Sequence, residues 1–270
     1  MNWQGKVVIV TGASSGIGKA YAELFAQRGA SVVLAARSVQ SLEEIKSKIS
    51  QTASGVLVVK ADVSIEDDCK NLIDITVKEF GKIDVLINNA GISMRSLLID
   101  TDTSVIKRLM EVNFYGTLYC TKYALPYLLK TKGSVLGVSS IAGYKGLPAR
   151  TGYSASKFAM QGFLESLRIE NLKTGLHVLI VCPGFTASNI RNVALKGDGS
   201  IQGETPRDEA KMMQPEEVAL HTLKAIEKRK STLILTTQGK LTVLLSKFFP
   251  KFMDKMVFNT MAKEPDSPFK

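Results

Sequence analysis

A tyrosine and a lysine four residues apart are the side chains in this sequence best suited to acid–base chemistry. Tyr153 and Lys157 share one face of a helix-forming stretch, because residues at i and i+4 are neighbours on an α-helix. A free tyrosine, with a pKa of about 10, is a poor base at neutral pH. We expect the ammonium of Lys157 to favour the phenolate and so to lower the pKa of Tyr153. Such a phenol can exchange a proton with a carbonyl or alcohol oxygen while a hydride moves to or from the carbon.

A glycine-rich turn follows the first apolar run of the chain. The sequence Thr11-Gly-Ala-Ser-Ser-Gly-Ile-Gly18 leads from that run into a helical stretch. Gly12, Gly16 and Gly18 let the backbone turn sharply and approach a pyrophosphate at the helix N-terminus, where free N–H groups favour anions. Such a turn can also be a simple tight connection. Its place after the first strand of an alternating α/β pattern favours a dinucleotide site.

The end of the second apolar run bears on which dinucleotide would bind. An acidic residue at this point accepts a hydrogen bond from the ribose 2′-hydroxyl and repels a 2′-phosphate. Here Ala36 stands where the acid is expected, and Arg37 and Ser38 follow it. A guanidinium and a hydroxyl suit a phosphate, although Arg37 could also be an ordinary surface cation. The absence of the acid favours NADP(H).

The stretches that must position these residues are of two alternating kinds. Apolar runs of strand length, rich in valine, isoleucine and leucine, alternate with longer stretches of helical period. Apolar runs without polar alternation are typical of parallel strands covered on both faces. The expected fold class is α/β: a single-domain, Rossmann-type, doubly wound parallel sheet of about seven strands, with helices on both faces and a C-terminal amphipathic helical extension. The predicted strands are 6–11, 31–36, 56–61, 85–88, 134–139, 176–182 and 231–237, and the predicted helices include 18–28, 64–80, 103–130, 154–173 and 215–229.

The pattern changes after residue 182. Residues 183–214 are mixed polar with weak periodicity, and a loop of this length in a compact domain is usually functional. We therefore expect a substrate lid at about 184–214, within a dinucleotide-binding catalytic domain that spans 1–238. Residues 239–270 are expected to form a basic amphipathic helical tail, broken at Pro250.

Three explanations of this tail remain open. It could dock on its own domain, form a contact between subunits, or lie in a membrane interface as a monotopic helix. The segment 224–263 holds nine basic and two acidic residues and thus most of the net charge of +10, which indicates a local role. Our hypothesis is that the tail covers or borders the substrate opening and admits apolar substrates.

Four further segments complete the pattern: Lys60-Ala-Asp-Val63, Asn88-Asn-Ala-Gly91, Asn113 within a predicted helix, and Ser139-Ser140 followed by Tyr153-Ser-Ala-Ser-Lys157. A Tyr-x-x-x-Lys pair alone is a weak signal, since helices contain such pairs by chance. A serine thirteen residues before the tyrosine, together with the glycine turn and Asn-Asn-Ala-Gly in this order, is highly specific. With these motifs in view, the chain resembles the short-chain dehydrogenase/reductase family over nearly its whole length.

The resemblance, together with the argument from Arg37, implies an NADP(H)-dependent oxidoreductase that acts on CH–OH and C=O groups through Tyr153. By resemblance, Ser140 would hydrogen-bond the substrate oxygen, Lys157 would also bind the nicotinamide ribose, and Asn113 would hold a water that relays the proton. The catalytic set is therefore Asn113, Ser140, Tyr153 and Lys157. The expected cofactor-binding residues are Gly12, Ser14, Ser15, Gly16, Ile17, Gly18, Arg37, Ser38, Asp62, Val63, Asn89, Ala90, Gly91, Tyr153, Lys157, Pro183, Gly184, Thr186 and Ser188.

Within the family, the Arg37 strand ending and the basic tail are most similar to the corticosteroid 11-beta-dehydrogenase-like branch, whose members are membrane-associated reductases of lipophilic carbonyls. The sequence differs from that branch because it shows no N-terminal anchor helix and no secretory signal. We expect a cytoplasmic protein, with peripheral membrane contact through the tail as an open alternative. The resemblance also implies a homodimer or homotetramer, paired through the helices that begin near Thr103 and Ser154.

The expected substrate pocket has a mostly apolar lining. Few charges in it disfavour small anionic acids and favour a lipophilic or aromatic ketone or aldehyde as substrate. The alternative function is a non-catalytic NADP(H)-binding regulatory protein on the same fold, against which the intact catalytic set argues. The pocket segments are 93–98, 141–150 and 183–214, with Met94, Leu97, Tyr144, Leu147, Phe185 and Leu195.

Composition argues against several other classes. The three cysteines lie far apart without metal-ligand spacing, so we expect reduced thiols and no metal site. His177 and His221 are isolated from any acid–nucleophile arrangement and are expected to be structural. The basic tail lacks interleaved base-stacking aromatic residues, which argues against nucleic-acid binding.

Overall fold

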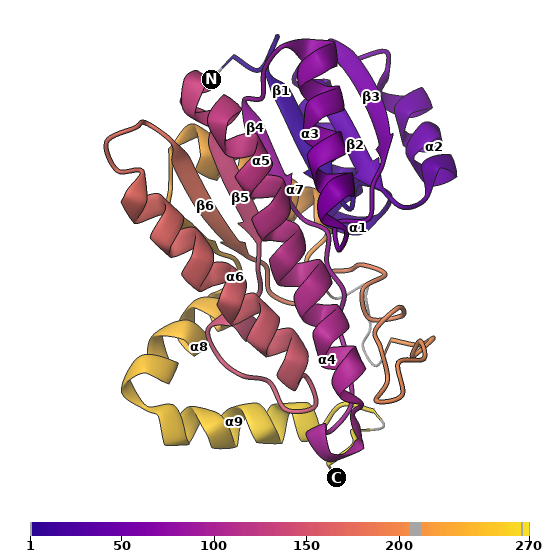
Figure 1. The fold of residues 1–270 in the computed structure, drawn as a ribbon. Helices are drawn as coiled ribbons and strands as arrows, with labels where there is room; N and C mark the ends of the chain where they lie inside the picture. Colours follow the sequence, from indigo (N-terminus) through magenta and orange to yellow (C-terminus); the bar gives the residue numbers. More distant parts are fainter. Residues whose placement is uncertain (1, 206–211, 266, 270) are drawn as a thin grey trace.

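The computed structural model describes residues 2–205, 212–265 and 267–269. In these ranges the strands form one parallel sheet of seven strands in the order β3-β2-β1-β4-β5-β6-β7 (Figure 1). The order reverses beside β1, as in doubly wound sheets, which confirms the predicted fold class. The strands are β1 (Val7–Thr11), β2 (Ser31–Ala36), β3 (Gly55–Lys60), β4 (Val85–Asn88), β5 (Ser134–Val138), β6 (His177–Cys182) and β7 (Thr232–Ile234).

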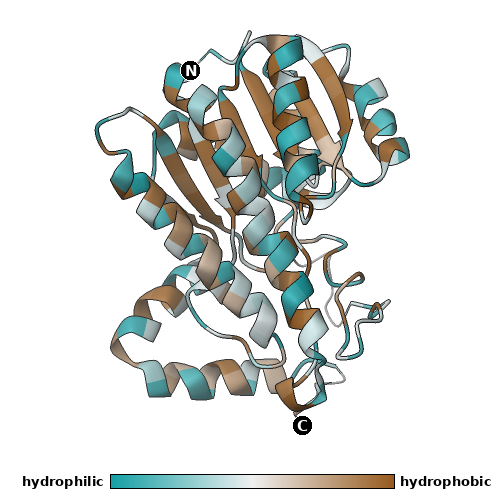
Figure 2. Cartoon of the chain, viewed as in Figure 1, coloured by the Kyte–Doolittle hydropathy of each residue, from teal (hydrophilic) through white to brown (hydrophobic). Residues whose placement is uncertain are grey.

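The strands are apolar because helices cover both faces of the sheet. Along β1, Val8 and Val10 face one core and Val7 and Ile9 face the other. The strands are accordingly brown in the hydropathy view (Figure 2). Two-sided burial of this kind leaves no place for the polar alternation of a half-exposed strand.

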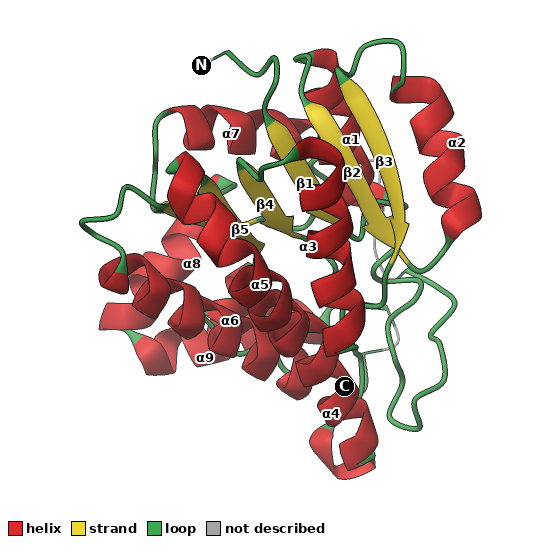
Figure 3. Cartoon of the chain, turned by 45° about the horizontal axis from the view of Figure 1, so that its top comes forward, coloured by secondary structure: helices red, strands yellow, loops and turns green. Residues whose placement is uncertain are grey.

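Helices cover both faces of the sheet (Figure 3). On one face α1 (Gly16–Gln27) and α7 (Pro215–Glu227) pack together, joined by the buried hydrogen bond between Tyr21 and Thr222, and α2 (Val39–Ile49) lies beside α1. The other face is covered by α3 (Glu66–Phe80), α5 (Gly116–Thr131) and α6 (Thr151–Glu170).

The predicted helix 103–130 is not one continuous α-helix. It consists of α4 (Thr103–Met110), a π-helical turn (Glu111–Tyr115) and α5. A π-helical turn inserts extra backbone into a helix and is frequent at functional sites. Asn113 occupies the middle of this turn and is fully buried. The prediction missed the interruption because local periodicity does not register one widened turn.

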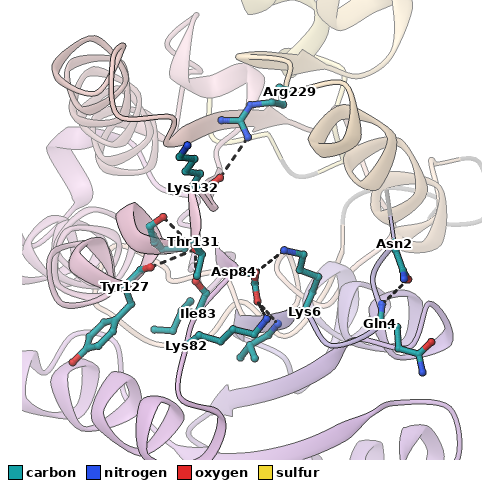
Figure 4. A network of polar contacts seen from close by, with 12 residues as sticks. Asn2, Gln4, Lys6, Lys82, Ile83, Asp84, Tyr127, Thr131, Lys132 and Arg229 are labelled. Carbon is teal, nitrogen blue, oxygen red and sulfur yellow. Dashed lines mark hydrogen bonds and ion pairs between the residues drawn. The ribbon is translucent and has the colours of Figure 1, made fainter.

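A carboxylate links the starts of β1 and β4, at the edge of the sheet where these strands begin (Figure 4). Asp84 accepts from Lys6 Nζ at 2.8 Å and from the Val7 N–H at 2.9 Å, and Lys82 Nζ lies 3.1 Å away. Burial raises the pKa of Asp84, but these three donors together hold it below its usual value. The network is structural, since the strands end on the opposite side.

The tail folds back on the rest of the chain as two helices, α8 (Thr237–Phe248) and α9 (Pro250–Ala262), with the break at the predicted proline (Figure 1). Gly239 of α8 packs against Ile141, and Asp254 of α9 pairs with Lys145 at 2.5 Å. Of the three explanations offered for the tail, docking on its own domain is therefore observed. No helix within the described ranges is long and apolar enough to cross a membrane.

The described part of the predicted lid forms irregular structure with three isolated bridges. Leu195 bridges to Met94 and to Ile201, and Thr186 bridges to Met213. The bridge from Leu195 to Met94 holds the segment after β6 against the segment after β4, and the other two bridges lie within the segment after β6. Residues 206–211 of the predicted lid lie outside the described residues, as do residues 266 and 270 of the tail.

Candidate active site

A cavity of about 570 Å³ lies where the sheet strands end. Residues that follow each of the strands β1 to β6 form its wall, together with residues of α6. Ligand sites in doubly wound sheets lie at these carboxyl ends, near the point where the strand order reverses. Apart from Gly18 and Asn113, every predicted site residue lines this cavity: Gly12, Ser14, Ser15, Gly16, Ile17, Arg37, Ser38, Asp62, Val63, Asn89, Ala90, Gly91, Ser140, Tyr153, Lys157, Pro183, Gly184, Thr186 and Ser188.

The glycine turn after β1 uses glycine for two separate reasons. Gly12 and Gly16 have positive φ angles of +64° and +52°, which side chains of other residues rarely tolerate. Gly18 instead allows a close approach, because a Cβ on it would collide with the Gly12 carbonyl oxygen and lie 2.5 Å from Asn89 Nδ2. Gly18 therefore shapes the cavity wall without lining it.

The first turn of α1 offers unoccupied donors to the cavity. Its N-cap residue, Ser15, makes no side-chain cap, and no acidic residue lies in the first turn. Uncapped N–H groups and the helix dipole favour an anion at this point. Together with the open glycine backbone, these donors fit the pyrophosphate of a dinucleotide.

Thr11 and Asn89 join the glycine turn to the end of β4. The Thr11 hydroxyl accepts from the N–H groups of Asn89 and Ala90 at 3.0 and 3.1 Å. The Asn89 side chain in turn donates to the carbonyl oxygens of Thr11 and Gly12 at 3.0 and 3.3 Å. The Asn-Asn-Ala-Gly motif thus holds the turn in place as well as lining the cavity.

The end of β2 presents Ala36, Arg37 and Ser38 to the cavity. Arg37 is exposed. Ser38 is the N-cap residue of α2, and its hydroxyl oxygen accepts from the Ser41 N–H at 3.4 Å. Asp62, at the end of β3, accepts from the Ser64 hydroxyl at 2.7 Å and N–H at 3.0 Å. Arg37 is therefore the cation available for an anionic group at this end of the cavity.

The pKa of Tyr153 is raised in the structure, whereas we expected it to be lowered. Burial raises the pKa of Tyr153 above its ordinary value, and a Ser140 hydrogen bond and the charges of Arg150 and Arg191 only partly oppose it. The Lys157 ammonium lies 5.7 Å from the centre of the phenol ring and donates to the Val138 carbonyl at 2.9 Å. The expectation that Lys157 makes Tyr153 acidic is thus wrong for the protein alone, because desolvation exceeds the effect of the nearby charges.

Lys157 is nearly fully buried among apolar and main-chain groups. Burial lowers its pKa to about 8 from 10.5. Its ammonium shares the end of the cavity with Ser140, whose oxygen accepts from the Ala142 N–H at 3.1 Å. That bond leaves the Ser140 hydroxyl hydrogen to be donated into the site.

Asn113 lies behind the cavity wall and not in it. Its Nδ2 donates to the Ile92 carbonyl at 3.0 Å and to Ser156 Oγ at 2.8 Å, while its Oδ1 accepts from the Ile92 N–H at 2.8 Å. Asn113 thus fixes the segment after β4 against α6. The structure gives it a role in holding these elements together, and its expected part in a proton relay stays a prediction.

Three arginines line the cavity wall: Arg108 of α4, Arg150 before α6 and Arg191 after β6. Arg150 and Arg191 lie in the expected pocket segments 141–150 and 183–214, but sequence reasoning gave their charges no weight. Arg108 lies outside those segments, and no local motif marks it. Of the apolar residues expected there, Leu147, Phe185 and Leu195 line the cavity, but Met94, Leu97 and Tyr144 do not. The expectation of few charges is therefore wrong.

Comparison with known proteins gives the family. The family model described as "short chain dehydrogenase" matches residues 6–198, which include the glycine turn, Ser140, Tyr153 and Lys157. The chain belongs to the short-chain dehydrogenase/reductase family. As a member of this family, it is an oxidoreductase of the nicotinamide-dependent, hydride-transferring type.

The curated relatives of this dehydrogenase include two groups. "Dehydrogenase/reductase SDR family member 7B" of Danio rerio is 34% identical over 250 residues, which cover 90% of this chain and 81% of the relative. "11-beta-hydroxysteroid dehydrogenase A" of Sesamum indicum is 42% identical over 188 residues, 69% of this chain. The match covers only 54% of the sesame protein's length.

Solved structures of the family share the fold. An alcohol dehydrogenase from Thermococcus sibiricus, complexed with 5-hydroxy-NADP, is 26% identical, with a TM-score of 0.73 over 84% of this chain and 93% of its own. A short-chain dehydrogenase/reductase from Burkholderia phymatum in complex with NAD has a TM-score of 0.83 over 93% of this chain and 96% of its own. At 23% identity the second likeness concerns the fold alone.

Proposed function

We propose that this dehydrogenase uses NADP(H) and reduces a lipophilic or aromatic ketone or aldehyde. The main support for this proposal is that Ser140, Tyr153 and Lys157 line the same cavity. The part of the cavity after β2 presents Arg37 and no acidic residue. Apolar side chains of Leu147, Phe185 and Leu195 support an apolar substrate body. A bound nicotinamide dinucleotide would supply or accept the hydride.

The residues that would hold the dinucleotide follow from the cavity. The glycine turn and the first turn of α1 would bind the pyrophosphate, and Arg37 with Ser38 the 2′-phosphate. Asp62 and Val63 would lie at the adenine, Asn89, Ala90 and Gly91 at the riboses, and Pro183, Gly184, Thr186 and Ser188 beside the nicotinamide. Lys157 would donate to the nicotinamide ribose hydroxyls.

Side chains of the protein would supply the proton that the substrate oxygen needs during reduction. Because burial keeps Tyr153 a neutral phenol at neutral pH, it is suited to donate its proton to a substrate oxygen during reduction. The hydroxyl hydrogen of Ser140 is available to the same oxygen. The charges of Arg150 and Arg191 would favour the phenolate that results, and Asn113, through a water, would link Lys157 to solvent.

The test of this function is a kinetic comparison of Tyr153→Phe with the wild type. We expect the variant to lose at least about a thousandfold in kcat, because a proton-transfer group contributes factors of this order. NADPH binding, followed by the fluorescence of the bound nucleotide, should stay within about threefold, since one hydroxyl in a large ligand site is removed. Unchanged turnover would exclude Tyr153 as the proton donor. A wild type that binds NADPH but reduces no ketone would favour the non-catalytic regulator.

Cofactor choice and substrate class each need a separate experiment. We expect Arg37→Ala to weaken NADPH binding at least about tenfold, the value of one lost charged hydrogen bond, and to leave NADH binding unchanged. A panel of steroid, aromatic and acyl ketones should include carboxylated and neutral members of matched size, because Arg108, Arg150 and Arg191 line the wall. Equal loss for both nucleotides in the Arg37 variant would remove the basis for NADP(H).

We also propose the assembly and location of the protein from its exposed faces. Self-association into a dimer or tetramer is supported by exposed apolar residues on α6, including Phe158. Contact with a membrane surface is supported by the exposed apolar and basic residues of α8 and α9, and a cytoplasmic location is part of the same proposal. Residues 1–238 would act as the catalytic unit, with a lid at about 184–214, and residues 239–270 as its tail.

A further inference from the structure

A residue just after α9 contacts a residue of the cavity wall. Glu264, two residues beyond α9, is only 5% exposed. Its Oε2 accepts from Arg150 Nη2 at 3.1 Å and lies 3.9 Å from Arg95 Nη2. Arg95 Nη2 also donates to the carbonyl oxygen of Pro265. Two arginines thus hold one buried carboxylate of the tail.

Each of these arginines belongs to a segment that forms the substrate side of the cavity. Arg150 lines the cavity and is the N-cap residue of α6, three residues before Tyr153. Arg95 donates its N–H to the Leu195 carbonyl at 2.9 Å, and Ser96 donates to the Ala149 carbonyl at 3.0 Å. The segments after β4 and before α6 therefore meet at Glu264, and the segment after β6 is bonded to the first of them.

We propose that Glu264 is a positioning residue of the active site, which holds the guanidinium of Arg150 in the cavity wall beside Tyr153. This inference rests on the proposed role of Tyr153 as proton donor. It assigns part of the site to the tail, which lies beyond the region matched by the family model. A buried carboxylate between two cations fixes their side chains more firmly than an exposed pair does, because water competes less for the contact.

Arg150 is one of several charged or polar groups that face Tyr153. Lys157 comes from the same helix, Ser140 follows β5, Cys182 ends β6 and Arg191 lies beyond it. Of these groups, Ser140 and the two arginines lower the pKa of Tyr153 against the effect of burial. Without the Glu264 carboxylate the Arg150 guanidinium would be held less firmly beside Tyr153 and part of this effect would be lost, so the pKa of Tyr153 would rise.

The experiment compares pH profiles of kcat for Glu264→Gln, Arg150→Met and the double variant. In the oxidative direction the reaction needs the phenolate, so a higher pKa moves the acidic limb of the profile to higher pH. We expect a shift of about half a pH unit or more for each single variant, and no further shift when Glu264→Gln is added to Arg150→Met. The matched control is Asp254→Asn, which removes a different ion pair of the tail, with Lys145, at a residue whose side chain is 66% exposed. Its profile should equal that of the wild type.

Three results would overturn the proposal: an unchanged profile in Glu264→Gln, a shift to lower pH, or a shift that persists on the Arg150→Met background. A shift in Asp254→Asn of the same size would also overturn it, because any loosening of the tail would then suffice. Phenolate absorbance in an alkaline titration, with each protein corrected by its Tyr153→Phe counterpart, reports the same pKa without substrate or nucleotide. If the wild type reduces no ketone but Glu264→Gln still moves the phenolate titration to higher pH, the positioning role is supported while the proposed function fails.

Discussion

We expect the pKa of the buried lysine of the site, Lys157, to depend on whether a nucleotide is bound. Lys157 is 3% exposed, and its pKa is lowered to about 8 by burial. In the protein alone it donates to one main-chain carbonyl, Val138. If the proposed ribose contact forms, additional oxygen acceptors would favour the ammonium and raise its pKa again. Nucleotide binding would then be coupled to proton uptake by this one side chain.

This coupling predicts how affinity depends on pH. Because binding raises the pKa of Lys157, the affinity for NADPH should be fully present below pH 8 and should fall as the pH rises above it, by up to about tenfold per pH unit. Cys182, whose pKa burial raises to about 12, stays neutral in this range. Isothermal titration in buffers of different ionisation enthalpy would measure the proton uptake directly. Lys157→Met should bind more weakly with no dependence across pH 8, and the same slope in both proteins would contradict the assignment.

At the scale of elements, the position of α1 against β1 depends on a residue without a side chain. A Cβ on Gly18 would meet the Gly12 carbonyl and Asn89 Nδ2, both of which form the turn. We expect Gly18→Ala to lower the free energy of unfolding by about 2 kcal/mol, the usual cost of overpacking, and to weaken NADPH binding. Urea unfolding and a nucleotide titration measure the two effects. Gly146→Ala is the matched control: nothing lies within 4 Å of its added Cβ, so its stability should change by less than about 0.5 kcal/mol. Equal effects of the two substitutions would contradict the close-packing argument.

The elements also show what the sequence could and could not predict. Each predicted strand overlaps an observed one to within a few residues, because two-sided burial leaves a continuous apolar run that is visible locally. The residues of the glycine turn and of Asn-Asn-Ala-Gly line the cavity because strand ends bring them there. The Asn113 side chain in the π-helical turn, in contrast, is bonded to the main chain of Ile92, twenty-one residues earlier. No short-range pattern records such a contact.

Electrostatics was the least predictable property. The pKa of Tyr153 depends on how deeply the phenol is buried and on charges from Arg150 and Arg191, which only the folded chain brings near it. Spacing along one helix revealed Lys157 but not its bond to the Val138 carbonyl. The contact of Glu264 with Arg150 spans 114 residues and was equally invisible. Charge effects of this kind require the tertiary structure.

For the whole molecule, one exposed stripe of α6 suits contact with a second copy. Ala155, Phe158, Gly162 and Ile169 are all exposed at helical spacing, and the Phe158 side chain is apolar and 47% exposed. Small and apolar residues on one stripe allow two helices to approach closely across a two-fold axis. We expect Phe158→Asp to raise the dissociation constant of the oligomer at least about tenfold, measured by light scattering during size exclusion. Leu241→Asp on the tail is the control for a tail-mediated contact. Dissociation by the tail substitution alone would place the interface on α8 instead.

The tail presents an apolar strip next to lysines, and this combination suits an anionic lipid surface better than a second copy. Two identical tails facing each other would bring lysines together, because Asp254, the single acid of α8 and α9, already pairs with Lys145. Polar and apolar residues alternate along both helices (Figure 2). The exposed residues concerned are Leu241, Leu244, Phe248, Phe249, Phe252 and Met256, with Lys240, Lys247, Lys251 and Lys255.

We therefore expect the protein to sediment with vesicles that contain phosphatidylserine and much less with vesicles of phosphatidylcholine alone, and added salt should weaken the binding. Each lysine near such a surface contributes about 1 kcal/mol, so Lys247→Glu with Lys251→Glu should reduce binding at least about tenfold. Replacing Phe248 and Phe252 by serine should reduce binding to both kinds of vesicle, because the inserted apolar area is lost. Ile169→Ser, an exposed apolar residue on α6, should leave binding unchanged. Equal binding of the wild type to both vesicles, insensitive to salt, would mean that charge does not direct the tail to a membrane, and the lysines would then need another partner.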